Sequence, residues 1–336
     1  MIKKIISCIL LIAIPLFTAS CNPEKQNYSE TTLEYFDTVT TVSGYFKSES
    51  DFKKCYNIIE KELENYHKLF DIYNNYDKIN NIKTINDKAG KSAVEVDESI
   101  IKLLQFGKQA YDFTNGNVNI CMGSVLKLWK TARETKILAK NQVLKKAKKY
   151  ISIDNLVIDN QENTVFLKNK NCSLDVGAIA KGFVCEQLKT KLSKIGFENG
   201  IINIGGNVMT VGKKAGDKEF SVGIKNPDQL DENIYIASVS NLSVVTSGDY
   251  ERNFEIGGKK YNHIISPETL APAENNKSAS VICENAAVAD ALSTALFISD
   301  YRQGLNLINS FDNCEALIID KNSNAHFSKD FNKFIK

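Results

Sequence analysis

The stretch "LDVGAIAKGF" (residues 174–183) determines how the rest of this 336-residue sequence is interpreted. It places an acid, two glycines and one lysine between a segment with strand character and a segment with helical character. Backbone amides at a helix start, together with a cation such as Lys181, favour an anion such as a phosphate. Asp175 would repel that phosphate, so we expect it to face a hydroxyl, a ring N–H or a structural amide. The glycine spacing fits neither a Walker A loop nor a Rossmann fingerprint, and tight packing without a ligand remains open.

Composition limits the classes of protein to consider. The chain is 43% hydrophobic and 24% charged with a net charge of +2, which predicts one large domain or two intimate lobes and gives no reason to expect nucleic-acid binding. The lysine-rich segment 140–151 is interpreted as a solvated helix face. No CxxC motif or Cys/His cluster is present, so a zinc site is not expected. We interpret the six cysteines beyond the N-terminal region as buried, unpaired small hydrophobes: Cys55, Cys121, Cys172, Cys185, Cys283 and Cys314.

The N-terminal region has the pattern of a lipoprotein signal. Lys3 and Lys4 precede an apolar run that is too short to span a membrane comfortably, and "FTASC" (17–21) resembles a bacterial lipobox. We therefore expect a signal peptide over 1–20, acylation of Cys21 with chains such as palmitate, a flexible tether over 21–33 and the folded domain over 34–336. This predicts a lipid-anchored protein facing the periplasm or the outside of the cell; an ordinary signal peptide cut nearby is the alternative.

Hydrophobic periodicity predicts an α+β protein. Apolar residues at spacings of three and four indicate a helix over 51–73, and further helices are expected near 98–113, after the opening stretch to about 195, and over 286–299. Short alternating or β-branched runs indicate strands between these helices. The predicted strands lie near 34–46, 152–158, 164–169, 200–208, 220–225, 234–239, 243–246, 314–320 and 325–329. Helices and strands alternate too irregularly for a doubly wound sheet.

Two further segments contain residues suited to chemistry. In "VADALSTALF" (288–297), Asp290 and Thr294 lie four residues apart and so share one helix face. A carboxylate, a hydroxyl and a backbone carbonyl would form half a shell for a hard cation such as Mg²⁺; a helix N-cap aspartate with a back-bonding threonine is the alternative. His263, in "YNHIISP", is suited to proton transfer or anion binding, against a structural role at a strand edge. His67 and His326 are interpreted as structural.

The order of the motifs resembles that of the ApbE-type family of FAD:protein FMN transferases. The matching segments are "GNVNICMGSVLKLW" (116–129), "LDVGAIAKGFVCE" (174–186), "NIGGN" (203–207), "SGDYER" (247–252), "HIISPETLAP" (263–272) and "ADALSTAL" (289–296). The resemblance covers roughly residues 34–328. It implies an ApbE-like (T-fold-like) α+β fold, with mixed sheets and packed helices in two intimate lobes and an FAD site between them.

The resemblance also implies roles for individual residues. A Mg²⁺ ion would be held by the Ala178 carbonyl and by the side chains of Asp290 and Thr294. His263 would lie near the reacting phosphates, and His263, Asp290 and Lys181 would form the catalytic set. The residues expected to contact FAD are Phe36, Tyr73, Asn117, Val118, Asn119, Asp175, Lys181 and Ile265.

The implied activity is transfer of FMN from FAD to a serine or threonine hydroxyl of a client flavoprotein, through a phosphoester and with release of AMP. The clients expected from the resemblance are subunits of membrane redox pumps or extracellular flavin reductases. Two alternatives stay open: an FAD pyrophosphatase that yields FMN and AMP, and a non-catalytic flavin-binding lipoprotein. The chain departs from the family pattern at several positions, all of them outside the expected metal ligands: Phe36, Asn119, Glu186, Asn207, Ser266 and Leu270.

Overall fold

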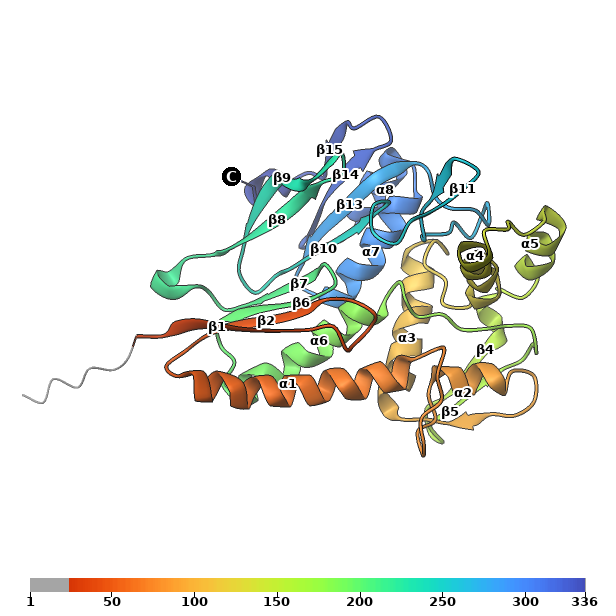
Figure 1. Ribbon diagram of the computed structural model, residues 1–336, viewed down its shortest axis with the longest axis horizontal. Helices are drawn as coiled ribbons and strands as arrows, with labels where there is room; N and C mark the ends of the chain where they lie inside the picture. The colour runs from red at the N-terminus through yellow and green to blue at the C-terminus, as the bar shows by residue number, and fades with distance from the viewer. Residues whose placement is uncertain (1–23, 336) are drawn as a thin grey trace, which may run out of the picture.

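An eight-stranded antiparallel sheet forms the centre of the molecule (Figure 1). The computed structural model describes residues 24–335. The order of the strands is β1-β2-β6-β7-β10-β13-β14-β15. Their bounds are β1 Gln26–Thr32, β2 Thr40–Phe46, β6 Gly200–Ile204, β7 Asn207–Val211, β10 Ser243–Gly248, β13 Asn276–Cys283, β14 Cys314–Asp320 and β15 Ala325–Phe327. The α+β class predicted from the sequence is confirmed.

Helices cover one face of this sheet and a β-hairpin covers the other. The helices of the first face are α1 Glu49–Phe70, α6 Ala180–Leu192, α7 Ala286–Ile298 and α8 Tyr301–Ile308. Successive residues of β10 point to opposite faces of the sheet. Val245 packs in the core beneath α7, and Val244 packs in the core beneath the hairpin. The hairpin consists of β8 Phe220–Asn226 and β9 Gln229–Val239. Helix α7 is buried on nearly every side, which explains its almost entirely apolar sequence.

A second, mainly helical part of the chain lies beside the helix-covered face (Figure 1). It contains α2 Ile82–Asp87, α3 Glu98–Phe113, α4 Gly123–Thr135, α5 Asn141–Lys148 and a small sheet of β3 Val94–Glu95, β4 Leu156–Asp159 and β5 Thr164–Leu167. The short hairpin β11 Phe254–Ile256 and β12 Lys259–Tyr261 follows β10. Within residues 24–335, no helix has the length and apolar character that crossing a membrane requires.

The predicted tether over 21–33 is wrong in its second half. Residues Gln26–Thr32 form the edge strand β1, which pairs antiparallel with β2. The sequence here is polar because an edge strand exposes much of its surface, so hydrophobic alternation gives little signal. The predicted signal peptide over 1–20 and the acylation of Cys21 lie outside the described residues.

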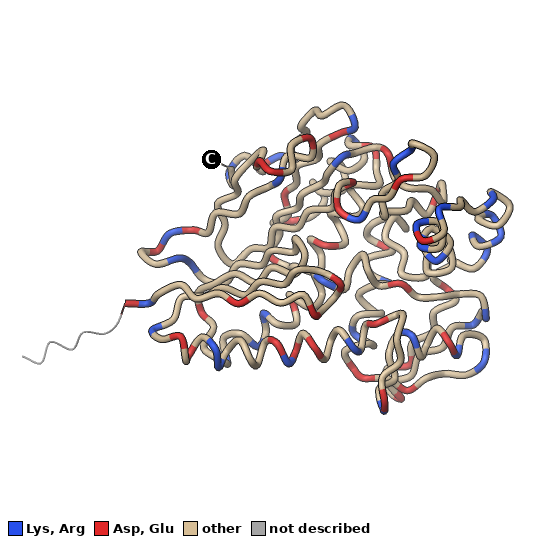
Figure 2. Tube along the Cα trace, viewed as in Figure 1, with Lys and Arg blue, Asp and Glu red and all other residues tan. Residues whose placement is uncertain are grey.

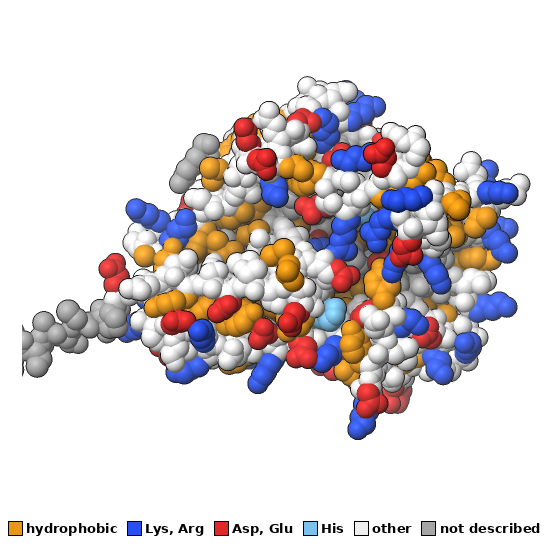
Figure 3. Space-filling view, in the orientation of Figure 1, with side chains coloured by type: hydrophobic (Ala, Val, Ile, Leu, Met, Phe, Trp, Pro, Cys, Tyr) orange, Lys and Arg blue, Asp and Glu red, His pale blue; other side chains and the backbone are white. Residues whose placement is uncertain are grey.

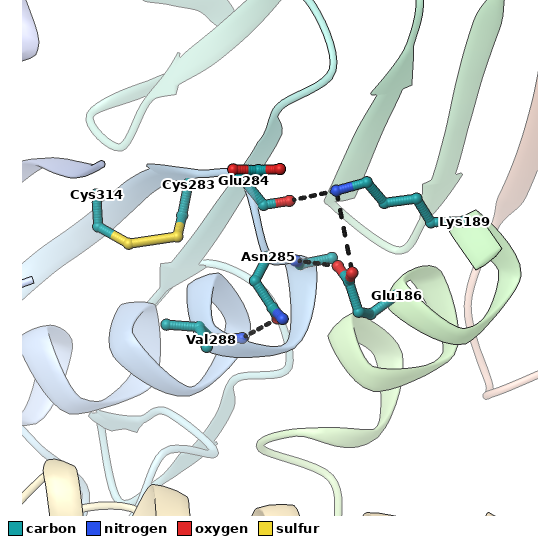
Figure 4. Close-up of a disulfide and its surroundings, with 8 residues drawn as sticks. Glu186, Lys189, Cys283, Glu284, Asn285, Val288 and Cys314 are labelled. Carbon is teal, nitrogen blue, oxygen red and sulfur yellow. Dashed lines mark hydrogen bonds and ion pairs between the residues drawn. A yellow bond between two sulfur atoms is a disulfide. The ribbon is translucent and has the colours of Figure 1, made fainter. Parts of the chain in front are cut away.

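The interpretation of all six cysteines as unpaired is also wrong. Cys283 and Cys314 form a disulfide (Figure 4), whereas Cys55, Cys121, Cys172 and Cys185 are free and buried. The bonded pair occupies directly opposed positions of β13 and β14, which brings the two sulfur atoms together. Strand β13 was absent from the sequence prediction because it is buried on both faces and therefore shows no alternation, and without it the pairing could not be foreseen.

Candidate active site

One cavity of ≈ 360 Å³ lies between the large sheet and the helical part of the chain. Its wall is built from the C-terminal end of α1, one face of α4, the "LDVGAIAKG" turn, the end of β10 and α7. Every residue that the sequence analysis proposed for the site, apart from Cys21, lines this cavity. They are Phe36, Tyr73, Asn117, Val118, Asn119, Asp175, Ala178, Lys181, His263, Ile265, Asp290 and Thr294.

Asp290 is the most deeply buried acid of this wall. Its Oδ2 accepts a hydrogen bond from the Gly182 amide at 2.8 Å, so an amide in the first turn of α6 binds a carboxylate of α7. Burial raises the pKa of Asp290, while Lys181, the Gly182 amide and Asn207 act in the opposite direction. Asp290 does not cap its helix, because Asn285 is the N-cap of α7 and accepts from the Val288 amide. The capping alternative is therefore wrong.

The oxygen atoms beside Asp290 fit a hard cation. Thr294 lies one helical turn further along α7, with its Oγ1 3.4 Å from the Ser247 Oγ. The Oδ1 atom of Asn207, which also lines the cavity, is buried and has no hydrogen-bond partner. Oxygen donors without nitrogen or sulfur suit Mg²⁺ rather than zinc. Within the described part of the chain, no group of three His, Cys, Asp or Glu side chains forms an alternative metal site.

Asp175 stabilises the "LDVGAIAKG" turn in the cavity wall. Its Oδ1 accepts from the Gly177 amide at 3.0 Å, which is the structural amide that the sequence left as one of three options. Burial raises the pKa of this carboxyl, and the Gly177 amide, Lys130 and Arg252 oppose the rise. Lys181 follows the turn in the first turn of α6 and also lines the cavity.

His263 is positioned to remain neutral. Its side chain is open to the cavity, but the surrounding protein limits its hydration and lowers its pKa to about 4, with Lys181, Arg252 and Arg133 contributing to the decrease. A neutral imidazole can accept a proton at neutral pH. The lowered pKa therefore argues against the binding of an anion by a charged imidazolium.

A strained turn supports Phe36 at the cavity. Both Phe36 and Asp37 adopt the left-handed conformation, with φ angles of 58° and 50°. Arg252 donates through Nη2 to the carbonyl oxygens of both residues, and the Phe36 amide donates to Nδ1 of His67. His67 thus has a structural role, as predicted, although it also lines the cavity.

The polar side chains of segment 117–119 form hydrogen bonds within the protein. The Asn119 side chain is occupied within the protein, because its Oδ1 accepts from the Cys121 amide and its Nδ2 donates to the Ile151 carbonyl. Asn117 donates to the Ser299 hydroxyl at 3.1 Å. The Val118 side chain is buried, at 1% exposed. The three side chains therefore offer few free polar groups to a ligand in the cavity.

Sequence reasoning missed the cationic part of the wall. Arg252, Lys130 and Arg133 all line the cavity, and Lys130 lies 3.4 Å from the centre of the Tyr73 ring. Figure 3 shows Lys and Arg side chains gathered beside the hollow in the molecular surface. Arg252 belongs to the quoted motif "SGDYER", and Lys130 and Arg133 lie three residues apart on α4, so both signals were present in the sequence.

Comparisons with known proteins identify the family and the fold. A model of the ApbE family matches residues 36–318. A FAD:protein FMN transferase of Treponema pallidum is 32% identical, over 71% of this chain and 70% of that protein. An ApbE protein of Thermotoga maritima has a crystal structure that is similar with a TM-score of 0.84 at 26% identity, over 93% of this chain and 100% of that one. The flavin transferase ApbE of Vibrio cholerae has the same fold, with a TM-score of 0.80 at 20% identity over 92% and 99% of the two chains.

Proposed function

This chain belongs to the ApbE family, as its motifs predicted, and we propose that it is a Mg²⁺-dependent FAD:protein FMN transferase. In this reaction a serine or threonine hydroxyl of a client flavoprotein attacks the FMN-side phosphorus of FAD. The bond from that phosphorus to the bridging oxygen breaks, and AMP leaves with the bridging oxygen. FMN remains on the client through a phosphoester.

The observation that carries the proposal is the meeting of residues from distant motifs at one cavity. Asp175, Lys181, His263 and Asp290 come from three separate motifs and all line it. A buried acid, a cation and a neutral histidine around a glycine-containing turn suit a substrate with two phosphates. The name of the Treponema pallidum relative adds support for flavin as the substrate.

The chain's oxygen donors would hold the cation. Asp290 and Thr294 would supply side-chain oxygens and Ala178 its backbone carbonyl. Bound Mg²⁺ would offset the charge of the two phosphates and the charge that develops on the leaving AMP. The low-dielectric surroundings that raise the pKa of Asp290 also strengthen its attraction to a cation.

The remaining residues position the substrate and move one proton. Lys181 would place a point charge against a phosphate, and Asp175 would fix the turn beside the flavin nucleotide. His263 would accept the proton of the attacking hydroxyl, because its lowered pKa keeps the imidazole neutral at neutral pH. Phe36, Tyr73 and Ile265 would bound the flavin.

The cellular setting is part of the proposal. We infer a lipid anchor on Cys21 that holds the domain at the outer side of the membrane, where redox-pump subunits or extracellular flavin reductases would be the clients. Metabolic labelling with a palmitate analogue tests the anchor. Loss of label in Cys21→Ala is expected, and retained label would contradict the assignment.

In-gel flavin fluorescence tests the reaction. The protein, FAD, Mg²⁺ and a peptide containing Ser-Ala-Thr are incubated, and the denatured products are separated. We expect a covalently fluorescent peptide; free FMN alone would indicate the pyrophosphatase, and neither product would indicate a flavin-binding protein. Asp290→Ala should abolish labelling because the metal site loses its one side-chain anion. Wild-type labelling in excess EDTA would refute the metal assignment.

A further inference from the structure

Helices α4 and α5 and the segment that joins them form a strongly basic element, here called the basic hairpin (residues 123–149). It contains nine cationic side chains and a single acid, Glu134. The cations are Lys127, Lys130, Arg133, Lys136, Lys140, Lys145, Lys146, Lys148 and Lys149. Figure 2 shows them as a run of basic positions at one end of the molecule, in a chain whose overall charge is only +2.

The positive charge of the basic hairpin is not neutralised within the protein. None of the ion pairs found among residues 24–335 contains one of these nine side chains. Lys130 lies over the Tyr73 ring, and the Lys148 ammonium donates to the Glu268 backbone carbonyl. Elsewhere the chain pairs many of its lysines with acids one helical turn away. The hairpin therefore projects a local positive field that favours an anionic partner.

Exposed apolar side chains lie among these cations. Ile137 is 72% exposed, and Leu138 and Val143 are 40% and 44% exposed. All three belong to the joining segment and the start of α5. A solvated helix face, which is how the sequence alone was interpreted, does not require apolar side chains at its tip. Apolar groups ringed by charges of one sign are typical of a surface that binds a partner.

The basic hairpin adjoins the candidate active site. Leu126, Trp129 and Arg133 of α4 line the cavity, while Lys145, Lys146 and Lys149 face solvent. A macromolecular acceptor that reaches the cavity beside α4 would lie against the hairpin. Charges near the entry to a site raise the rate at which an oppositely charged partner arrives.

We propose that the basic hairpin docks an acidic segment of the client protein, next to the hydroxyl that receives FMN. This inference rests on the proposed transferase function. A protein partner is favoured over an anionic membrane by position. Strand β1 begins five residues after Cys21, a span of at most about 18 Å, and it lies at the opposite end of the long axis from α5 (Figure 1). An anchored molecule therefore has the hairpin at its far end.

Binding of charge-matched peptides tests the proposal. Two fluorescein-labelled peptides share a central Ser-Ala-Thr, flanked in one by six glutamates and in the other by six glutamines. Anisotropy with the full chain in detergent, with FAD and Mg²⁺ present, should give a Kd about tenfold lower for the glutamate peptide at low salt. This preference should disappear in the triple variant Lys145→Glu/Lys146→Glu/Lys149→Glu.

A matched triple variant controls for charge alone. Lys61→Glu/Lys194→Glu/Lys225→Glu changes the net charge equally at exposed positions outside the cavity and should keep the preference. FAD affinity, followed by flavin fluorescence, should be unchanged in both variants, since none of these lysines lines the cavity.

The outcomes separate the docking surface from the reaction. Equal affinity for the two peptides, or an unchanged preference in the hairpin variant, would overturn the docking proposal. Hairpin-dependent binding to phosphatidylglycerol vesicles without any preference for the glutamate peptide would overturn it in favour of a membrane surface. A preference that requires the hairpin, on a peptide that acquires no FMN, would support the docking surface and refute the transferase assignment.

Discussion

The contact between α6 and α7 at Gly182 offers a direct test of the site. A Cβ atom at this position would lie 2.4 Å from both the Ala286 carbonyl oxygen and the Asp290 Cβ, whereas ordinary contacts begin at 3.4 Å. In Gly182→Ala the two helices must therefore separate by about 1 Å. Overpacking of this kind costs about 1–3 kcal/mol, and the better helix propensity of alanine offsets about 0.5–1 kcal/mol of it. We expect a net loss of about 1–2 kcal/mol in the free energy of unfolding.

The effect on function should exceed the effect on stability. The displacement moves the Asp290 carboxylate relative to the Ala178 carbonyl and the Gly182 amide, and a shift of 1 Å in a catalytic group can cost about 100-fold in rate. Urea unfolding and in-gel FMN transfer measure the two effects. Gly304→Ala in α8 is the control, because its Cβ would meet the side-chain ends of Ile318 at 2.9 Å and Leu296 at 3.2 Å, and Gly304 does not line the cavity. Wild-type transfer by a folded Gly182→Ala protein would refute the idea that this helix contact positions Asp290.

Three further predictions concern single residues. Lys181→Ala should weaken FAD binding, because a point charge on a phosphate is lost; an unchanged affinity in a fluorescence titration would contradict that role. The pKa of His263 is lowered to about 4, so its imidazole stays neutral above that pH. We therefore expect kcat/KM to stay level from pH 7 to 5 and to fall only as the pH approaches 4. A decline centred near pH 6.5 would show an unperturbed histidine. Leu270 is buried and has a φ of 59°. The free energy of unfolding, measured in urea, should fall by about 2–3 kcal/mol in Leu270→Gly and by more in Leu270→Ala, because alanine keeps the left-handed strain that glycine relieves. A smaller loss in the alanine variant than in the glycine variant would contradict this account.

The parts of the fold that the sequence predicted are those with strong periodicity or glycine-containing motifs. The helix predicted over 98–113 has those bounds in the structure, and the helix predicted over 286–299 differs by one residue. The regular spacing or the uniform run of apolar residues in these segments leaves few structures other than a helix. Strand β13 was missed because burial on both faces removes the alternation of apolar and polar residues. Strand β1 was missed because this edge strand is polar. Strand β1 pairs with β2, the next strand along the chain, so only the error at β13 concerns partners that lie further away in the sequence.

The disulfide shows how one such error leads to another. Cys283 ends β13 and Cys314 begins β14, so only the register of these two strands reveals that the cysteines face each other. The same end of β13 leads into α7, whose first amide, that of Ala286, donates to Glu186 of α6 (Figure 4). Glu186 was noted from the sequence only as a departure from the family pattern. Its carboxylate helps to join α6 to α7, the two helices that supply Lys181 and Asp290.

The departures from the family pattern have local explanations where the structure shows their contacts. Asn119 both accepts from the Cys121 amide and donates to the Ile151 carbonyl, and an ionised aspartate could not make the second bond. Leu270 stands where the family pattern has glycine and keeps a left-handed backbone, while its side chain packs with Met122, Val125 and Ile265. At both positions the side chain stabilises a loop that carries the cavity wall. Both substituted side chains thus have contacts that support the cavity wall, and the partly matching motifs that contain them meet at one cavity.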